Sequence, residues 1–128
     1  MSKVLLIEPD RVLARVFKTA LETSGNRVSV MTSAQAAIFE ADEFQPDLII
    51  LELQLVAHSG IEFLYELRSY PEWQSIPLII HTIVPFNEFQ RSWQLLQNEL
   101  GVVSYLYKPQ TTLAELKKQV QLYSAVTT

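Results

Sequence analysis

Polar side chains that could do chemistry occur in this sequence at regular intervals, each directly after a short apolar run. They are two acids, Glu8 and Asp10, a third acid, Glu52, a hydroxyl, Thr82, and an ammonium, Lys108. Carboxylates, a hydroxyl and an ammonium around one crevice would form a phosphate or metal site. Any one of them could simply mark the polar end of a strand. The whole set, with one group per repeating unit, favours a site.

The apolar runs that precede these residues are typical of buried strands. The run that ends at Glu52 is a continuous series of Leu and Ile rather than an alternating one, which indicates a central strand covered on both faces. The predicted strands are 4–7, 28–30, 46–53, 77–80 and 102–107.

Amphipathic stretches lie between the strands and predict helices. Asp10 is well placed as the N-cap of the first helix. The expected core stripe of that helix is Val12, Leu13, Val16, Phe17, Ala20 and Leu21. A helix opening at Pro85 and closing at Gly101 would bury Phe89, Trp93 and Leu96. The other helices are expected around residues 34–41, 60–70 and 112–123.

This fivefold βα alternation predicts an α/β fold, a doubly wound (βα)5 flavodoxin-like three-layer sandwich. Its parallel five-stranded sheet is expected in the order 2-1-3-4-5. No linker interrupts the pattern, so residues 1–128 are expected to form a single domain. Only residues 124–128 follow the last helical stripe, which leaves little room for an output domain.

The composition excludes several classes of function. Hydrophobic residues make up 48% and charged residues 19% of the 128, as in a globular protein. A net charge of −4 gives no support for nucleic-acid or membrane-surface binding. There is no cysteine, which excludes thiolate metal sites and disulfides. The first apolar run is too short for a signal or transmembrane helix, so we expect a cytoplasmic protein.

Several motifs together make the sequence similar to a known family. They are Glu8-Pro9-Asp10 after the first apolar run, Pro46-Asp47 before the Leu/Ile run, Gly60 with Glu62-Phe63-Leu64, Ile76-Pro77 before the fourth run, and Tyr105 with Lys108-Pro109. At these intervals the chain resembles the receiver domain of two-component response regulators over essentially its whole length.

The resemblance implies a role for each strand-end residue. In that family an aspartate at the position of Glu52 is phosphorylated by a histidine kinase. Acids after the first strand hold Mg²⁺, which implies metal-site positions at Glu8 and Asp10. The Thr82 and Lys108 positions contact the phosphoryl group.

Two further expectations follow from the same resemblance. Tyr105 occupies the position of an aromatic switch residue that swings inward when the threonine moves. The Lys108-Pro109 bond is commonly cis in the family, and so is expected to be cis here.

The chain departs from the family pattern where the chemistry takes place. The phosphoacceptor position holds Glu52 instead of Asp, and Pro9 replaces one of the paired metal-site acids. Val56-Ala57 replaces the usual Pro-Gly, and Ile83 a smaller residue. A displaced nucleophile and a missing ligand both weaken phosphoryl transfer, which depends on positioning and charge neutralisation. We therefore expect weak Mg²⁺ binding or none, and no enzymatic activity.

Without a metal, Glu52 is expected to pair with Lys108, and Glu8 would compete for the same ammonium. The hypothesis is a phosphorylation-independent receiver that acts through protein partners. These would be a histidine kinase or a downstream effector, bound at the face formed by the last two helices and last strand. The protein would be a monomer or weak homodimer.

Two other functions stay open. One is a phosphorylation-competent regulator that uses Mg²⁺, and the other is a flavodoxin-like cofactor-binding domain with a roomy pocket at the strand ends. His58 and His81 have no second histidine at ligand spacing and are not expected to be catalytic.

Overall fold

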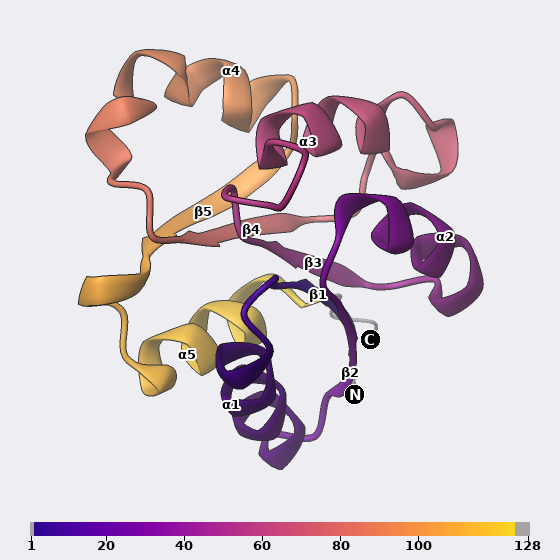
Figure 1. Cartoon of the computed structure of the whole chain (residues 1–128), viewed down its shortest axis with the longest axis vertical. Coiled ribbons are helices and arrows are strands. Elements are labelled where there is room, and N and C mark those ends of the chain that lie inside the picture. The colour runs from indigo at the N-terminus through magenta and orange to yellow at the C-terminus, as the bar shows by residue number, and fades with distance from the viewer. Residues whose placement is uncertain (1, 125–128) are drawn as a thin grey trace.

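The computed structural model describes residues 2–124 and shows a parallel five-stranded sheet between two helical layers (Figure 1). The strand order is β2-β1-β3-β4-β5, so the predicted fold and strand order are confirmed. The strands are β1 (Lys3–Ile7), β2 (Arg27–Met31), β3 (Leu48–Leu51), β4 (Leu78–Thr82) and β5 (Val102–Tyr107).

Five α-helices cover the two faces of the sheet. Helices α1 and α5 lie on one face, and α2, α3 and α4 lie on the other (Figure 1). Their bounds are α1 (Arg11–Thr23), α2 (Ala34–Phe44), α3 (Gly60–Arg68), α4 (Trp93–Asn98) and α5 (Leu113–Tyr123). Among the described residues, no helix combines the length and apolarity that crossing a lipid bilayer requires.

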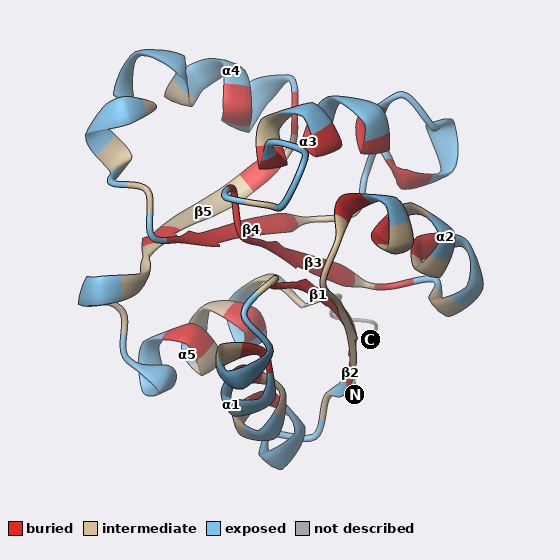
Figure 2. Cartoon of the chain, in the orientation of Figure 1, coloured by how far each residue is buried: buried red, intermediate tan, exposed pale blue. Residues whose placement is uncertain are grey.

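Strand β3 lies at the centre of both apolar cores (Figure 2). Its side chains alternate between them: Ile49 and Leu51 join the core under α2, α3 and α4, and Leu48 and Ile50 join the core under α1 and α5. All four are fully buried. A strand covered on both faces needs a continuous apolar run, which explains the sequence pattern.

The exit from β3 is fixed by a glycine. A Cβ on Gly60 would lie 2.6 Å from the Cα of Leu53, so no side chain fits there. Ser59 caps α3 and forms a reciprocal capping box with Glu62. This close contact therefore fixes the start of α3 next to Leu53, the residue that follows Glu52.

The expected core stripe of α1 is partly wrong. Val12 is 73% exposed and Val16 42%, whereas Ala14, Phe17 and Leu21 are buried. The Asp10 carboxylate accepts from the Val12 and Leu13 amides at 3.0 and 3.1 Å, as a predicted N-cap should. Because α1 begins at Arg11, the helix face that packs on the sheet carries Ala14, Phe17 and Leu21.

The expected helix from Pro85 to Gly101 is also wrong. Two 3-10 turns, η2 (Phe86–Glu88) and η3 (Gln90–Ser92), precede a helix α4 of six residues. The ring of Phe86 packs against Trp93 and Tyr105, with centroids 5.4 and 5.1 Å apart. A continuous helix from Pro85 is therefore replaced by turns that direct aromatic rings towards β5.

The Lys108-Pro109 bond is trans, which corrects the expectation of a cis bond. Residues Lys108–Gln110 form a 3-10 turn, and the Thr111 amide donates to the Lys108 carbonyl at 3.2 Å. The expectation of little room for an output domain rests partly on residues 125–128. These residues lie outside the described part of the chain.

A buried guanidinium joins α3 to the segments that enter β4 and β5. Arg68 Nε donates to the Leu100 carbonyl at 2.9 Å, and Nη2 donates to the Ile76 carbonyl at 2.6 Å. Nη1 also donates to the Trp73 carbonyl. Burial lowers the pKa of Arg68. This clamp holds the edge of the sheet opposite to the predicted site.

Candidate functional site

Three strands bring charged side chains to one edge of the sheet. Ile7 and Leu51 are register partners in β1 and β3, so Glu8 and Glu52 leave the sheet side by side. Lys108 follows β5 and its ammonium contacts both, donating to Glu52 Oε1 at 2.6 Å and to Glu8 Oε1. Glu8 is 2% exposed and Glu52 3%, so the ion pairs are shielded from solvent.

Both oxygens of Glu52 are occupied by donors. Oε1 accepts from the Lys108 ammonium and from the Ile83 amide at 3.2 Å. Oε2 accepts from the Thr82 hydroxyl and from the Gln54 amide at 3.0 Å. Four donors satisfy the acceptor capacity of one carboxylate. The side chain is therefore held as an anion in a fixed position.

The two buried acids differ in their electrostatics. Burial raises the pKa of Glu8, and the Lys108 ammonium opposes this only in part. Burial also acts to raise the pKa of Glu52, but the hydrogen bonds from Lys108, Thr82 and the Gln54 amide outweigh it and lower that pKa. The surroundings of Glu52, with Lys108, Thr82 and the Gln54 amide together, therefore stabilise its charge more effectively than the surroundings of Glu8 do.

The residues at the metal-site positions do not converge on a common point. Asp10 directs its carboxylate to the start of α1 as a helix cap, and its amide donates to Glu8 Oε2 at 3.2 Å. Pro9 offers no side-chain ligand, and the ammonium of Lys108 lies between Glu8 and Glu52. No group of three potential ligands in residues 2–124 is arranged to hold a metal ion. This arrangement does not fit the octahedral oxygen shell of Mg²⁺.

A chain of hydrogen bonds runs from Glu52 to Tyr105. The Thr82 hydroxyl donates to Glu52 and accepts from the Val84 amide at 3.1 Å. The Tyr105 hydroxyl then donates to the Val84 carbonyl at 2.6 Å. Burial, together with the charges of Glu88 and Glu52, raises the pKa of Tyr105, which keeps its hydroxyl a donor.

Aromatic rings surround Tyr105 on the side of η2, η3 and α4. Besides Phe86, the rings of Phe89 and Trp93 lie 6.2 and 6.3 Å from it, centroid to centroid. The sequence predicted Phe89 and Trp93 as core residues, and both pack at the edge of the core. Tyr105 is thus held at the ring by packing and at the hydroxyl by Val84.

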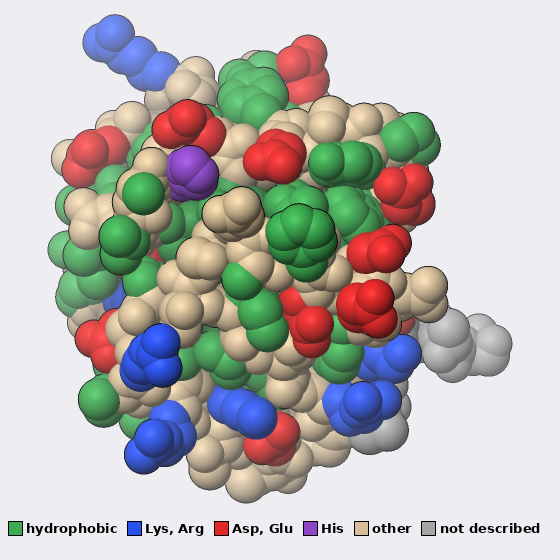
Figure 3. Space-filling view, turned by 45° about the vertical axis from the view of Figure 1, so that its right-hand side comes forward, with side chains coloured by type: hydrophobic (Ala, Val, Ile, Leu, Met, Phe, Trp, Pro, Cys, Tyr) green, Lys and Arg blue, Asp and Glu red, His purple; other side chains and the backbone are tan. Residues whose placement is uncertain are grey.

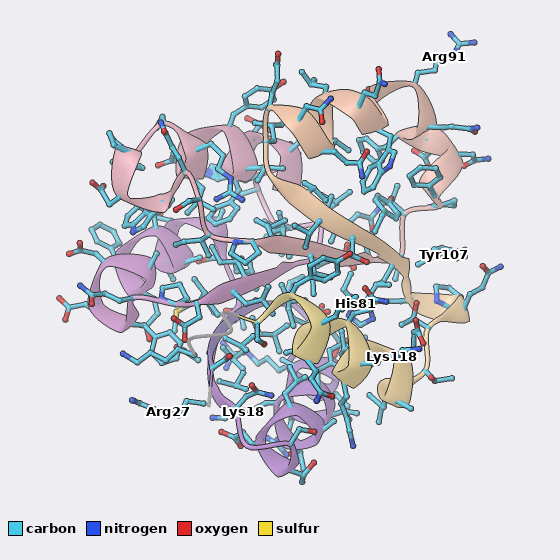
Figure 4. All side chains as sticks on the ribbon, turned by 180° about the vertical axis from the view of Figure 1, so that it is seen from behind. Lys18, Arg27, His81, Arg91, Tyr107 and Lys118 are labelled. Carbon is cyan, nitrogen blue, oxygen red and sulfur yellow. The ribbon has the colours of Figure 1, made fainter. Side chains whose placement is uncertain are left out.

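His81 of β4, labelled in Figure 4, lies on the face of the sheet that α1 covers. Its ring packs edge-on against Phe17, with centroids 4.8 Å apart, and its Nδ1 is buried with no hydrogen-bond partner among the described residues. Burial, then the charge of Lys108, lowers its pKa to about 4. His81 is therefore neutral at neutral pH.

The structure thus gathers four of the predicted site residues, Glu8, Glu52, Thr82 and Lys108, and it places Asp10 in a helix cap instead. The sequence did not reveal the backbone donors of Gln54 and Ile83, since main-chain direction has no residue signature. It also missed Arg68, because an arginine next to Leu67 carries no sign that it is buried.

Comparison with known proteins gives a consistent result. Residues 4–121 match the model of the response regulator receiver domain family. The chain is 35% identical over 109 residues to the KDP operon transcriptional regulatory protein KdpE of Escherichia coli (strain K12), covering 85% of this chain and 45% of that protein. It is 29% identical over 112 residues to the phosphate regulon transcriptional regulatory protein PhoB of Rhizobium meliloti (strain 1021), covering 88% of this chain and 48% of that protein.

These values mean that the chain spans about half the length of the curated relatives it matches. Among solved structures, chemotaxis protein CheY4 of Vibrio cholerae superimposes with a TM-score of 0.84, covering 96% of this chain and 98% of that chain. The sequence identity to it is 21%, so this likeness establishes the fold alone.

Proposed function

The chain belongs to the response regulator receiver domain family, and from this premise we propose that it signals without being phosphorylated. It is a receiver domain of a two-component response regulator. The proposal that the domain is not phosphorylated rests on one observation. Glu52, at the phosphoacceptor position, is buried and bonded through both oxygens.

The state of Glu52 opposes its use as a nucleophile. An attacking carboxylate oxygen needs a free lone pair directed at phosphorus, in line with the leaving oxygen. Each Glu52 oxygen already accepts two hydrogen bonds, one of them from a buried ammonium or hydroxyl. The extra methylene of Glu also moves these oxygens from where an aspartate would hold them, and small displacements are costly in rate.

The lack of a fitting Mg²⁺ site opposes the reaction in a second way. Phosphoryl transfer relies on a cation that neutralises charge on the transferring group. Here Pro9 removes one ligand and Asp10 caps α1, and the Lys108 ammonium contacts both Glu8 and Glu52. We therefore derive no metal-dependent step and propose that the chain has no enzymatic activity.

The same groups support a fixed signalling conformation. The Glu52 carboxylate occupies part of the place of a phosphoaspartate, although it carries less charge than a phosphoryl group. It holds Thr82, and through Val84 it fixes the hydroxyl of Tyr105. We propose that these contacts hold the domain in one signalling conformation, whether active or inactive, without a phosphoryl group.

Signalling by such a domain must pass through contacts with other proteins. Receiver domains interact with histidine kinases and effectors, and we propose the face of α4, β5 and α5 as the contact surface. Tyr105 lies on β5 within this face, and a groove beside it is lined by residues of η2, β5 and α5. A cofactor-binding role is disfavoured, because buried side chains fill the strand ends.

Incubation with acetyl phosphate and Mg²⁺ followed by intact-mass measurement tests the proposal. We expect no mass increase of one phosphoryl group in the natural chain. The matched variant Pro9→Asp/Glu52→Asp, which restores both acids, is expected to gain one. A phosphoryl adduct on the natural chain that disappears in Glu52→Gln would contradict the proposal.

A further inference from the structure

The two helical layers carry opposite charge. Helices α1 and α5 contain five basic and two acidic residues. Helices α2 and α3 contain five acidic residues and one basic residue, Arg68, which is buried. In the view of Figure 3, most basic side chains lie over the lower half of the surface, and acidic side chains are spread from the top to below the middle.

Each layer also exposes apolar side chains beside its charges. On α1, Val12 is 73% and Val16 42% exposed, next to the exposed Arg11 and Arg15. On α2, Phe39 is 70% exposed at a groove of about 430 Å³. Residues of α2, α3 and the loops beside α3 line this groove: Ala34, Gln35, Ile38, Phe39, His58, Glu66 and Tyr70. Exposed apolar residues rimmed by charge are typical of interaction sites.

Among residues 2–124, the charged side chains of these helices form no salt bridge. The two salt bridges found in residues 2–124 both involve Lys108. The acids of α2 and α3 and the bases of α1 are therefore available to another molecule. The two surfaces lie on opposite faces of the sheet, so one copy can present both at once (Figure 1).

We propose that α1 of one copy binds in the α2–α3 groove of a second copy. The Val12 and Val16 stripe would pack on Phe39 as an amphipathic helix packs into an apolar groove. Arg11 and Arg15 would face Glu66, which lines the groove, and the exposed Asp42, which lies about one helical turn after Phe39 on α2. This inference does not depend on whether Glu52 is phosphorylated.

The charge pattern determines the symmetry of the contact. A two-fold contact of either surface with its own copy would bring like charges together. The α1-to-groove contact is heterologous and does not close at two copies, so it extends head to tail. Because its charged pairs are exposed, it is weak and salt-sensitive.

Sedimentation velocity on the full chain tests the self-association. We expect a weight-average mass that rises with concentration beyond that of a dimer at about 0.1 M NaCl. At about 1 M NaCl, where the screening length falls from about 10 Å to about 3 Å, the rise should be lost. A chain that stays monomeric at all concentrations in low salt overturns the proposal, as does a mass that levels off at a dimer.

A pair of charge-reversal variants tests the assigned surfaces. Arg11→Glu/Arg15→Glu makes the α1 surface acidic, and Asp42→Lys/Glu66→Lys makes the groove basic. Each alone should weaken self-association about tenfold, and an equimolar mixture of the two should restore association. Failure of the mixture to associate overturns the pairing, even if each variant alone is monomeric.

Arg91→Glu and Glu88→Lys are matched controls in the η2–η3 segment. Arg91 projects into solvent away from α1 and α2 (Figure 4), and Glu88 is exposed. Both variants should associate like the natural chain. Amide chemical shifts that change on dilution should map to α1, α2 and α3. Changes confined to α4, β5 and α5 would overturn the proposal.

Discussion

Two cations, the buried Arg68 and the half-buried Lys108, hold the two edges of the sheet in different ways. Lys108, at the carboxyl edge, bonds to the carboxylates of Glu8 and Glu52. Arg68, at the opposite edge, bonds to backbone carbonyls of Leu100, Trp73 and Ile76. The partners of the Lys108 ammonium are carboxylates, which can take up a proton. The partners of the Arg68 guanidinium are backbone carbonyls, which do not titrate.

The difference indicates what each edge can do. An ion pair of titratable groups responds to pH and to the arrival of another charge, as a signalling site must. A guanidinium among carbonyls responds to neither and acts as a structural clamp, for which arginine with its five donors is well suited. Substitutions of Lys108 and Arg68 should therefore both lower the free energy of unfolding, but only the loss caused by substituting Lys108 should depend on pH.

The largest expected effect is that of Arg68→Met. It leaves several buried carbonyls without donors, so we expect a loss of about 3–5 kcal/mol in the free energy of unfolding. The loss should be the same at every pH between 5 and 8, because no partner titrates. Urea denaturation measures it, with the exposed Arg91→Met as a control expected near zero. A loss that varies with pH would contradict the assignment.

Lys108→Met is expected to cost about 2–4 kcal/mol at neutral pH, because it leaves two buried carboxylates unpaired. Without the ammonium, the pKa of both acids in the folded state should lie above the value in the unfolded chain. The variant therefore regains stability as the pH falls and the acids become protonated. Denaturation at pH 7 and pH 5 checks this. If Lys108→Met loses the same free energy of unfolding at pH 7 and at pH 5, the predicted difference from Arg68→Met is contradicted.

The lowered pKa of His81 leads us to expect a smaller loss of stability, which appears only at acidic pH. Its pKa is lowered from 6.5 to about 4 by burial and by Lys108, so the unfolded chain binds the proton more readily. Stability should fall as the pH drops from about 6.5 towards 4, by up to about 3 kcal/mol from this residue. His81→Phe, which keeps a ring against Phe17, should be less acid-sensitive than the natural chain over that range. Parallel stability curves would contradict this prediction.

The sequence was sufficient to predict the fold because its apolar runs and turns repeat with one period. The continuous run of β3 required a strand buried on both sides, and the structure confirms this. The expected order 2-1-3-4-5 is also confirmed, although hydrophobic periodicity alone does not give strand order. The same topology brings Glu8, Glu52 and Lys108 together, since parallel strands end at a common edge. Residue type alone, however, did not show which carboxylate oxygen meets which donor.

The errors came from tertiary packing that periodicity does not contain. Val12 and Val16 fit an apolar stripe, yet the start of α1 turns them to solvent. Phe89 and Trp93 fit a long helix, yet both pack against Tyr105 from short turns and the six-residue α4. Arg68 gave no signal, because burying it depends on a fold that brings the Leu100 carbonyl, 32 residues further along the chain, next to α3.

The bridge from Lys108 to two acids also constrains how this sequence can change. Glu52→Asp alone would shorten the reach towards Lys108 and Thr82 while the metal-site acid is still missing. Pro9→Asp alone would place a third negative charge beside Glu8 and Glu52. Each single step weakens the present site without restoring phosphoryl chemistry, and only the two together offer a gain. If the proposed function holds, phosphoryl chemistry at this site therefore requires both substitutions at once, and each one alone gives a less stable chain.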